Sequence, residues 1–340
     1  MVDPLPVVGR GWPRGASEAP DVESVGAVGE RMLDAIETVI DGKAAVIRTA
    51  LVVLFSEGHL LIEDVPGVGK TMLAKALAAS MSGTVRRIQF TPDLLPSDVT
   101  GVSVYEPEHH TFEFRPGAVF ANVVIGDEIN RASPKTQSAL LECMEERQVT
   151  VDGVTYSMEP PFFVVATQNP VEMEGTYPLP EAQRDRFTAQ VAMGYPSSDA
   201  ELTMLDTHSG REPLADLEPV TTAAEVSALI NVVRGVHVAE EVRRYVVDLV
   251  TATRRHPELR LGASPRAGLQ LLRTARAAAA LEGRAYVLPD DVQALAGAVL
   301  SHRILLNPDA AANQRQPYDI VTELIARLPL PAPGAIRRSR

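Results

Sequence analysis

The chain has 340 residues, of which 45% are hydrophobic and 22% are charged, and its formal net charge is −12. This composition is ordinary for a globular protein of about two domains, and it argues against disordered and membrane-spanning chains. A protein that holds duplex nucleic acid by its phosphates normally has a basic face, so the acidic total argues against that class as well. The single cysteine, Cys143, excludes an internal disulfide and a multi-cysteine zinc site.

The N-terminal segment, residues 1–22, is rich in proline and glycine and predicts a flexible tail. It lacks the basic start and the apolar core of a signal peptide. The longest apolar stretch, residues 44–55, contains Arg48 and is far shorter than the roughly 20 residues that a membrane-spanning helix needs. We therefore expect a cytoplasmic protein that does not insert into a membrane.

Two helices are predicted before the first strand. From Val25 to Ile40 the apolar residues recur at the spacing of an amphipathic helix, and Asp41-Gly42 marks its end. A second helix, over about residues 44–57, leads into the apolar run 59–62. We expect that run to be a buried strand.

The most informative segment follows this strand and precedes a helix-forming stretch, residues 72–79. A strand, a glycine loop and a helix in this order are the context of a phosphate-binding loop, because backbone N–H groups and the positive end of the helix face the phosphates. A chance glycine turn is the weaker alternative. The residues that we assign to nucleotide binding are Asp64, Val65, Pro66, Gly67, Val68, Gly69, Lys70, Thr71 and Met72. Lys70 would reach the β- and γ-phosphates of the nucleotide, and Thr71 would hold Mg²⁺. The usual motif opens with glycine where this chain has Asp64.

Three further segments, residues 84–90, 122–126 and 162–166, predict strands. Residues 122–126 and 162–166 are nearly all apolar, and we expect all three segments to be strands that are buried on both faces of a parallel sheet. Because helical stretches lie between them, a three-layer α/β nucleotide-binding core with a parallel sheet fits best. Residues 147–158 alternate in character around Asp152-Gly153, which predicts a β-hairpin.

Polar residues follow two of these strands, at the sheet edge where open α/β sheets bind ligands. Asp127 and Glu128 follow the strand 122–126. We predict that Asp127 holds the Mg²⁺ complex, mostly through water, and that Glu128 polarises the attacking water. Asn169 follows the strand 162–166, and we predict that it positions this water against the γ-phosphate. The alternatives are an acidic pair that opens a loop and an asparagine that favours a turn before proline.

Beyond residue 196 the pattern changes to helices alone, over about residues 222–235, 239–255, 265–282, 289–301 and 317–327. Ser264 and Pro265 form a good helix start, with serine as the N-cap and proline in the first turn. A smaller all-helical domain is therefore predicted after the core. The predicted domains are a core over residues 23–200, a linker over 201–221, a helical lid over 222–330 and a C-terminal tail over 331–340.

Several long runs of the chain occur in an order that is specific. They are residues 87–98, 114–117, 127–132, 137–146, 166–170 and 262–267. Together they closely resemble the MoxR family of AAA+ ATPases, and the resemblance extends over about residues 25–305. Asp64 at the start of the glycine loop is also ordinary for this family. The resemblance implies an ATPase that uses ATP and Mg²⁺ and consists of an AAA+ core and a helical lid.

The resemblance also implies roles for two arginines. Arg186 matches the arginine finger that reaches the γ-phosphate held by a neighbouring subunit. Arg266 matches the second sensor, an arginine of the lid that contacts nucleotide. Guanidinium groups stabilise the charge on a phosphoryl group during its transfer. Arg184 stands where similar sequences often have leucine, so it remains an alternative finger, and without the resemblance a surface ion pair would be preferred for either role.

Two insertions resemble elements that project from the ring towards substrate or partner in this branch of AAA+ proteins, although plain surface loops are the alternative. One lies between the strand that contains Ile88 and Phe120, and the other is the predicted hairpin 147–158. The resemblance further implies a homo-oligomeric ring, a hexamer, that acts as a chaperone. Such proteins remodel or activate client proteins, often ones with a von Willebrand factor A domain.

Two other functions remain open from the sequence. Related AAA+ branches include nucleic-acid motors, loaders and transcription regulators, although the charge of −12 and the lack of a recognisable nucleic-acid module argue against them. DNA-stimulated ATPase activity that falls steeply with salt would support that interpretation. A nucleotide-dependent switch with negligible turnover is the third interpretation, and a phosphate-release assay would separate it.

Overall fold

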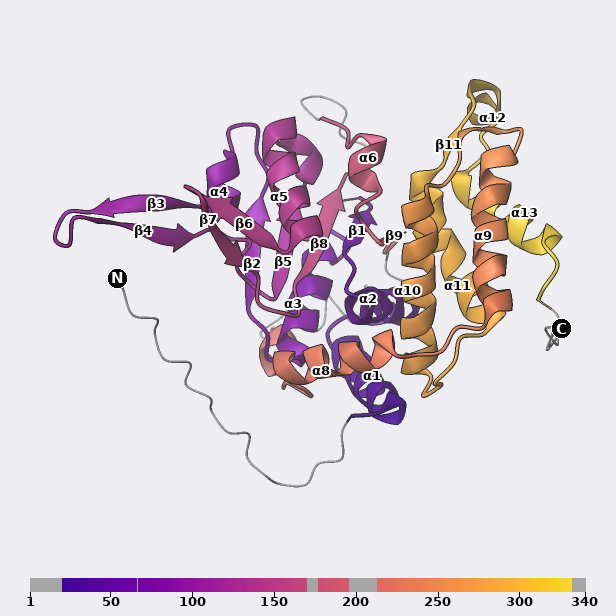
Figure 1. The fold of residues 1–340 in the computed structure, drawn as a ribbon, viewed down its shortest axis with the longest axis horizontal. Coiled ribbons are helices and arrows are strands. Elements are labelled where there is room, and N and C mark those ends of the chain that lie inside the picture. Colours follow the sequence, from indigo (N-terminus) through magenta and orange to yellow (C-terminus); the bar gives the residue numbers. More distant parts are fainter. Residues whose placement is uncertain (1–19, 66, 170–176, 196–212, 332–340) are drawn as a thin grey trace, which may run out of the picture.

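A parallel sheet forms the centre of the protein, which a computed structural model describes over residues 20–65, 67–169, 177–195 and 213–331. The five strands of the sheet have the order β2-β5-β8-β1-β9 (Figure 1). They are β1 (Leu60–Glu63), β2 (Val85–Gln89), β5 (Val123–Asp127), β8 (Phe163–Gln168) and β9 (Ala189–Val191). The strands predicted over 84–90, 122–126 and 162–166 are confirmed, with ends shifted by one or two residues. The expectation that the first of them is buried on both faces is wrong, because β2 is the edge strand of the sheet and only Ile88 of its five residues is buried.

Helices cover both faces of this sheet, because successive strand residues point to opposite sides. Val123 and Ile125 of β5 belong to a core that includes the N-terminal helices, whereas Val124 belongs to a second core on the other face. The helices of the core domain are α1 (Val22–Glu37), α2 (Ala44–Phe55), α3 (Lys70–Ser80), α4 (Pro96–Thr100), η1 (Ile129–Arg131), α5 (Pro134–Glu146) and α6 (Glu181–Arg184). All residues of β5 are buried. The predicted three-layer α/β fold is confirmed.

Two hairpins leave the core. They are β3 (Gly101–Glu106) with β4 (Thr111–Pro116) and β6 (Gln148–Val151) with β7 (Val154–Ser157). Asp152 and Gly153 have φ angles of 50° and 79°, as a two-residue hairpin turn requires, so the predicted hairpin is confirmed. The rings of Phe114 and Tyr156 stack with their centroids 3.9 Å apart, and the hairpins therefore contact each other. Figure 1 shows β3 and β4 extending away from the sheet.

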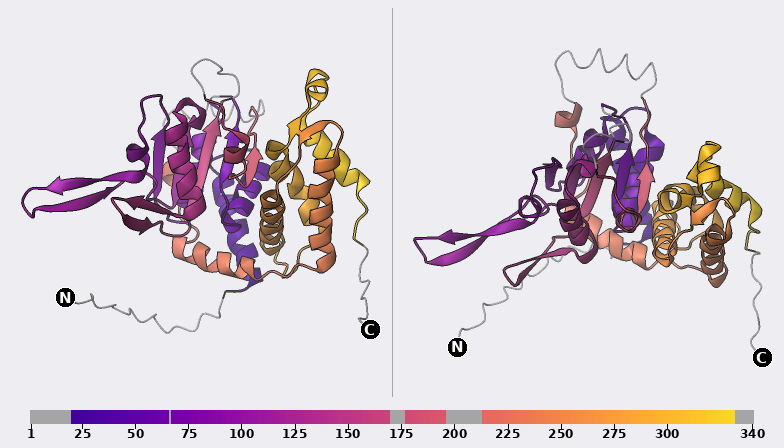
Figure 2. Two further views of the ribbon diagram at one scale, coloured as in Figure 1. Left: turned by 45° about the horizontal axis from the view of Figure 1, so that its top comes forward. Right: turned by 90° about the horizontal axis from the view of Figure 1, so that it is seen from above.

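The C-terminal part is mostly helical and lies beside β9 (Figure 2). Its elements are η2 (Pro213–Asp216), α8 (Ala223–Arg234), α9 (Glu240–Arg255), α10 (Pro265–Leu281), α11 (Pro289–Leu300), η3 (Ser301–Arg303), α12 (Pro308–Ala312) and α13 (Pro317–Arg327). Ser264 caps α10 by accepting a hydrogen bond from the backbone of Ala267, as predicted. The expectation of helices alone missed the short antiparallel pair β10 (Leu259–Leu261) and β11 (Leu305–Leu306). Strands this short leave no periodicity in a sequence.

The predicted domain boundaries remain predictions. Residues 1–19, 201–212 and 332–340, which belong to the expected tails and linker, lie outside the described residues. Helix α8 packs against α1 and α2 as well as α10, so it contacts the core before the lid helices begin. Among the described helices, none is long and apolar enough to cross a membrane.

Candidate active site

The glycine loop leaves the carboxyl end of β1 and leads directly into α3. Gly67 and Gly69 have φ angles of 86° and 91°, which is the left-handed conformation that glycine adopts most easily. Helix α3 starts immediately after Gly69, so its free backbone N–H groups lie at the loop, where a phosphate can accept them. Val68 and Met72 are partly buried against the core. Pro66, also assigned to nucleotide binding, lies outside the described residues.

Asp64, the residue that departs from the usual motif, connects the loop by a hydrogen bond to Gly194, which is distant in the sequence. One carboxylate oxygen accepts a hydrogen bond from the backbone N–H of Gly194 at 2.5 Å, and the other accepts from Val65 at 2.7 Å. The carbonyl oxygen of Asp64 accepts from Lys70 Nζ at 2.5 Å. Burial lowers the pKa of Lys70, and the carboxylates of Asp64 and Asp127 oppose that shift. Asp64 therefore stabilises the shape of the loop.

Asp127 is buried at the carboxyl end of β5 and has several polar neighbours. Thr71 Oγ1 lies 3.3 Å from Asp127 Oδ2, and Thr167 Oγ1 donates to Oδ1 at 3.2 Å. Arg87 Nε donates to Oδ2 at 2.6 Å. The structure thus brings together Thr71 and Asp127, which we predicted to hold Mg²⁺. A hydroxyl and a carboxylate are hard oxygen ligands, so these residues fit that ion.

No group of three or more histidine, cysteine, aspartate or glutamate side chains suited to a metal occurs among the described residues. Magnesium retains several waters and binds through one or two protein oxygens plus substrate phosphates in such sites. The donor set of Thr71 and Asp127 is consistent with an ion that arrives with a nucleotide.

Glu128, the predicted activator of water, has a left-handed backbone with φ 56° and ψ 48°. This conformation costs about 1–3 kcal/mol for a residue with a side chain and is frequent in active sites. Its carboxylate accepts hydrogen bonds from Gln89 at 3.1 Å and from Arg131 at 3.0 Å. Its backbone N–H donates to Thr167 Oγ1 at 2.9 Å. Asn169 is buried and follows β8 directly, so it lies at the same edge of the sheet.

Arg87, Gln89 and Thr167 belong to this edge although the motifs assign them no role. Arg87 and Gln89 flank the buried Ile88 on β2, and in the parallel register with β5 Gln89 lies beside Asp127. The sequence offered one signal for this role: two polar residues flank an apolar one in a strand that was predicted to be buried. Thr167 gives no such signal, because threonine is common in strands.

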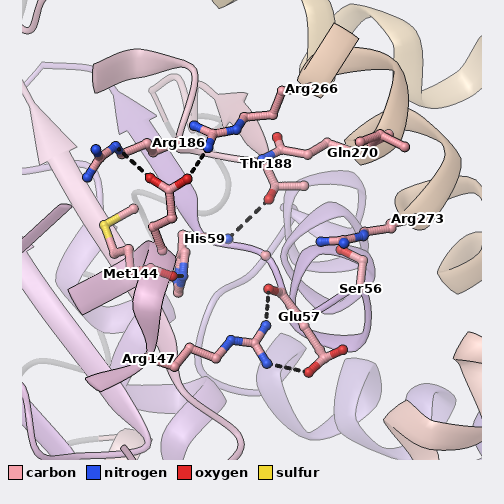
Figure 3. A pocket seen from close by; sticks show the side chains of 13 residues that line it. Ser56, Glu57, His59, Met144, Arg147, Arg186, Thr188, Arg266, Gln270 and Arg273 are labelled. Atoms are coloured by element: carbon pink, nitrogen blue, oxygen red, sulfur yellow. Dashed lines mark hydrogen bonds and ion pairs between the residues drawn. The ribbon is translucent and has the colours of Figure 1, made fainter. Parts of the chain in front are cut away.

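Arg186 and Arg266, the arginines implied to contact phosphate, meet beside one cavity (Figure 3). This cavity lies at the amino edge of the sheet, where the strands begin, whereas the glycine loop lies at the carboxyl edge, where they end. Arg186 Nε lies 3.3 Å from Oε2 of Glu145, and Arg266 forms a hydrogen bond and ion pair with Oε1 of the same carboxylate. Both arginines line a cavity of about 270 Å³. Arg184, the alternative finger, lies on α6 and is not part of the cavity lining.

The position of this cavity separates the arginine pair from the glycine loop of the same chain. Its lining includes residues 56–59, which precede the amino end of β1, and Thr188, which precedes β9. The glycine loop instead follows the carboxyl end of β1, a strand of four residues. Such a strand spans roughly 13 Å, more than an arginine side chain can bridge. Arg186 and Arg266 therefore lie at the amino ends of β1 and β9, whereas the glycine loop lies at the carboxyl end of β1.

Arginine dominates the charge of the cavity. Arg147 and Arg273 line it in addition to the Arg186 and Arg266 pair, and Glu57 and Glu145 are its acidic residues. Arg147 bonds to Glu57 at 2.5 Å. Burial opposes ionisation of Glu57, but hydrogen bonds from Arg147 and Arg234 outweigh it and lower the pKa of that carboxyl group. The cavity is thus suited to an anionic partner.

His59 also lines this cavity, but its contacts are structural. Its Nδ1 accepts a hydrogen bond from the backbone N–H of Val164 at 3.0 Å, which leaves the Nε2 proton for the carbonyl of Met144 at 3.0 Å. Burial lowers the pKa of His59 to about 4. The neutral ring therefore joins β1, β8 and α5 at neutral pH.

Two segments of the chain match known families. Residues 59–189 match the ATPase family associated with various cellular activities (AAA), and residues 251–324 match the AAA lid domain. The first segment contains the glycine loop, Asp127, Glu128 and Arg186, and the second contains Arg266. The two matched segments therefore include both edges of the candidate site.

The chain is also similar to proteins over nearly their whole length. It is 50% identical over 301 residues to the uncharacterized protein YeaC of Bacillus subtilis, which covers 88% of this chain and 94% of that protein. It is 40% identical over 316 residues to Chaperone MoxR1 of Mycobacterium tuberculosis (90% and 83%) and 33% identical to Protein MoxR of Paracoccus denitrificans (88% and 95%). The crystal structure of a candidate ATPase from Cytophaga hutchinsonii superimposes with a TM-score of 0.85 at 37% identity, covering 91% of this chain and 96% of that chain.

Proposed function

The chain belongs to the MoxR family of AAA+ ATPases and is an ATP-hydrolysing enzyme, and we propose that it hydrolyses each ATP between two neighbouring subunits of a hexameric ring. The glycine loop of one subunit would hold the nucleotide, and Arg186 and Arg266 of the next subunit would complete the site. One observation carries the proposal: the arginine pair lies at the sheet edge opposite to its own glycine loop. A head-to-tail contact between copies brings these two edges together, and such contacts close into rings.

The residues at the carboxyl edge would bind ATP and direct the attacking water. Lys70 would bind the β- and γ-phosphates, while Thr71 and Asp127 would hold Mg²⁺. Bound Mg²⁺ neutralises negative charge on the phosphate oxygens. Glu128 would exchange its hydrogen bonds from Gln89 and Arg131 for one from the water that it orients. Asn169 would hold this water in line with the γ-phosphate.

The arginines at the amino edge would stabilise the charge that develops on the transferring phosphoryl group. Their present partner is Glu145, whose side chain is 34% exposed. Ion pairs of this exposure are worth about 0–1 kcal/mol each. A triphosphate, with its greater charge, can therefore replace Glu145 as the partner of Arg186 and Arg266.

The hydrolysis cycle would serve a chaperone that remodels or activates a client protein in the cytoplasm. One support is the similarity to a relative named Chaperone MoxR1. A second is the β3–β4 hairpin, which extends from the core and exposes 72% of Phe112 and 47% of Tyr105. These aromatic side chains would contact the client, for which a protein with a von Willebrand factor A domain is a candidate. A lysate pull-down with Glu128→Gln in ATP would test for such a client.

Mixing two inactive variants tests the shared site. Lys70→Ala loses the nucleotide half and keeps its arginines, whereas Arg186→Ala keeps the nucleotide half. We expect Arg186→Ala alone to bind ATP normally but to lose about 10³–10⁵-fold in kcat. A mixture of the two variants should regain activity, since roughly a quarter of the interfaces in a randomly mixed ring combine both intact halves.

The control is a mixture of Lys70→Ala and Glu128→Gln. Both changes affect the same half of the site, so this mixture should stay inactive. Wild-type hydrolysis by Arg186→Ala alone, or no recovery when it is mixed with Lys70→Ala, would show that the site is not shared. Native mass spectrometry of Glu128→Gln with ATP would measure the ring size, and EDTA should abolish turnover if Mg²⁺ is required.

A further inference from the structure

Arg303 is a buried charge of the lid to which the ATPase chemistry assigns no role. Its side chain is only 1% exposed. Most of its partners lie in the core turn that carries Arg186. Arg303 Nε donates to Asp185 Oδ1 at 2.8 Å. Its terminal nitrogens donate to the carbonyl oxygens of Asp185 at 3.2 Å, of Phe187, and of Thr188 at 3.1 Å.

The carboxylate of Asp185 also binds the start of the helix that carries Arg266. Asp185 Oδ2 accepts a hydrogen bond from Ser264 Oγ at 3.0 Å, and Ser264 is the N-cap of α10. Arg303 reaches the same helix through a hydrogen bond to Gln270. Figure 3 shows Arg186 from the core and Arg266 from the lid pointing towards one another. Asp185 therefore connects the two segments that supply the arginine pair.

Arg303 holds a fixed orientation in this connection because its side chain is buried and all three of its guanidinium nitrogens donate hydrogen bonds. Guanidinium has its donors in a fixed planar fork, so several simultaneous bonds determine its orientation. Burial lowers the pKa of Arg303 to about 10 and the charge of Asp185 opposes the shift, so the side chain stays charged at neutral pH. His302 adds a hydrogen bond from Nε2 to the carbonyl of Phe187 at 3.1 Å. Since a buried charge without its partner is costly, the lid and the turn stay together.

We infer that Arg303 is a positioning residue that sets the distance between Arg186 and Arg266. The lid and the core turn thereby present the arginine pair as one preassembled unit to the neighbouring subunit. This inference rests on the shared-site proposal. When Arg303 is lost, the turn and α10 can shift independently, and a displacement of about 1 Å at reacting groups can cost about 10²-fold in rate.

The first test is Arg303→Met in the full chain. We expect kcat to fall by about 10²-fold while ATP affinity stays at the wild-type value, because the glycine loop lies at the other edge. Mixing with Lys70→Ala should restore activity, since Lys70→Ala supplies an intact arginine pair. Arg303→Lys keeps the charge but lacks the planar fork, so its kcat should lie between those of Arg303→Met and wild type.

Two matched controls separate positioning from general stability. Arg315→Met removes another lid arginine that forms two ion pairs, with Glu258 and Glu323, and should keep wild-type kcat. Ser264→Ala removes an N-cap and one bond to Asp185, whereas Thr222→Ala removes only the N-cap of α8. Ser264→Ala should lower kcat several-fold relative to Thr222→Ala. This second pair decides the matter if Arg303→Met folds poorly.

Wild-type kcat in folded Arg303→Met, or equal kcat in Ser264→Ala and Thr222→Ala, would overturn the inference. So would an Arg303→Met defect that Lys70→Ala does not restore although it restores Arg186→Ala, because the damage would then include the nucleotide half. If the mixture of Lys70→Ala with Arg186→Ala also stayed inactive, the shared-site proposal itself would fail, and this inference with it.

Discussion

The two edges of the sheet carry different kinds of site. At the carboxyl edge, Lys70, Thr71 and Asp127 lie close together and come from motifs that are continuous in the chain. At the amino edge, Arg186 of the core and Arg266 of the lid both pair with Glu145. We propose that the groups of the first edge bind a nucleotide and that the cations of the second stabilise a reacting phosphate. One copy of the chain contains both groups of residues, at opposite ends of the strands.

The edges also differ in how the fold holds their residues. At the carboxyl edge, strained backbone at Glu128 and left-handed glycines in the loop orient the groups. At the amino edge, buried polar side chains such as His59 and Arg303 join segments that are distant in sequence. Local geometry therefore shapes the nucleotide half, whereas a long-range hydrogen-bond network shapes the arginine half. Four changes test this contrast, in order of decreasing expected effect.

Glu128→Gln, at the carboxyl edge, should cause the largest loss of ATP hydrolysis. A group that activates water contributes about 10²–10⁴-fold, so kcat should fall by that factor while ATP still binds. Steady-state phosphate release and titration with a fluorescent ATP analogue measure the two quantities. Glu240→Gln, which removes a carboxylate of an exposed lid ion pair, is the control and should leave both unchanged. Wild-type turnover by Glu128→Gln would remove this residue from the mechanism.

Acid should lower the free energy of unfolding through His59, which lies at the amino edge. The native ring stays neutral down to a pKa of about 4, whereas the unfolded ring takes up a proton near its ordinary value of 6.5. The unfolded state therefore binds more protons between these values, and the free energy of unfolding falls as pH decreases, by about 1.4 kcal/mol per pH unit for one histidine. Burial also lowers the pKa of His302, which adds to the effect in the same direction.

The measurement is urea unfolding of wild type and His59→Asn at several values between pH 7 and 5. His59→Asn should show a shallower loss of stability with acid, whatever its stability at pH 7. His109→Asn removes an exposed histidine and should keep the wild-type slope. An unchanged slope in His59→Asn would mean that this ring does not titrate as its burial requires.

Asp64→Gly restores the glycine that usually opens the loop, and we expect it to destabilise the protein. It removes the carboxylate that accepts from Gly194 and Val65, and hydrogen bonds to a charged group are worth about 1.5–3 kcal/mol. Urea unfolding measures the loss. Asp64→Asn keeps an acceptor and should lose less. Equal stability of Asp64→Gly and wild type would show that the departure from the usual motif has no structural role.

Glu145→Gln should have the smallest effect, and in the opposite direction. It weakens the ion pairs that engage Arg186 and Arg266 in the single chain, each worth about 0–1 kcal/mol. The arginines should then bind a neighbour's nucleotide more readily. The protein concentration that gives half-maximal ATPase activity should therefore be lower than for wild type. Glu142→Gln, an exposed carboxylate on the same helix, is the matched control. A higher protein requirement for Glu145→Gln would contradict a competing role for this carboxylate.

Much of the core could be predicted because its signals are local. Apolar runs identified the strands 122–126 and 162–166, and Asp152-Gly153 identified a hairpin whose positive φ angles the structure confirms. The pair β10 and β11 could not be predicted, because its strands are too short to show a pattern. Arg87 and Gln89 were missed as site residues because their role depends on the pairing of β2 with β5.

The sequence by itself determined the nucleotide half of the site. Its glycines, lysine and threonine lie within one strand, loop and helix, so their spacing along the chain determines their arrangement in space. Only the tertiary structure decided where Arg186 and Arg266 lie. Both arginines pair with Glu145 of α5, and Arg303 of the lid binds the turn at Asp185, next to Arg186. Contacts between distant segments depend on packing and buried charge, which no local pattern records. The physical separation of the two edges, from which we propose a shared site, follows from that packing.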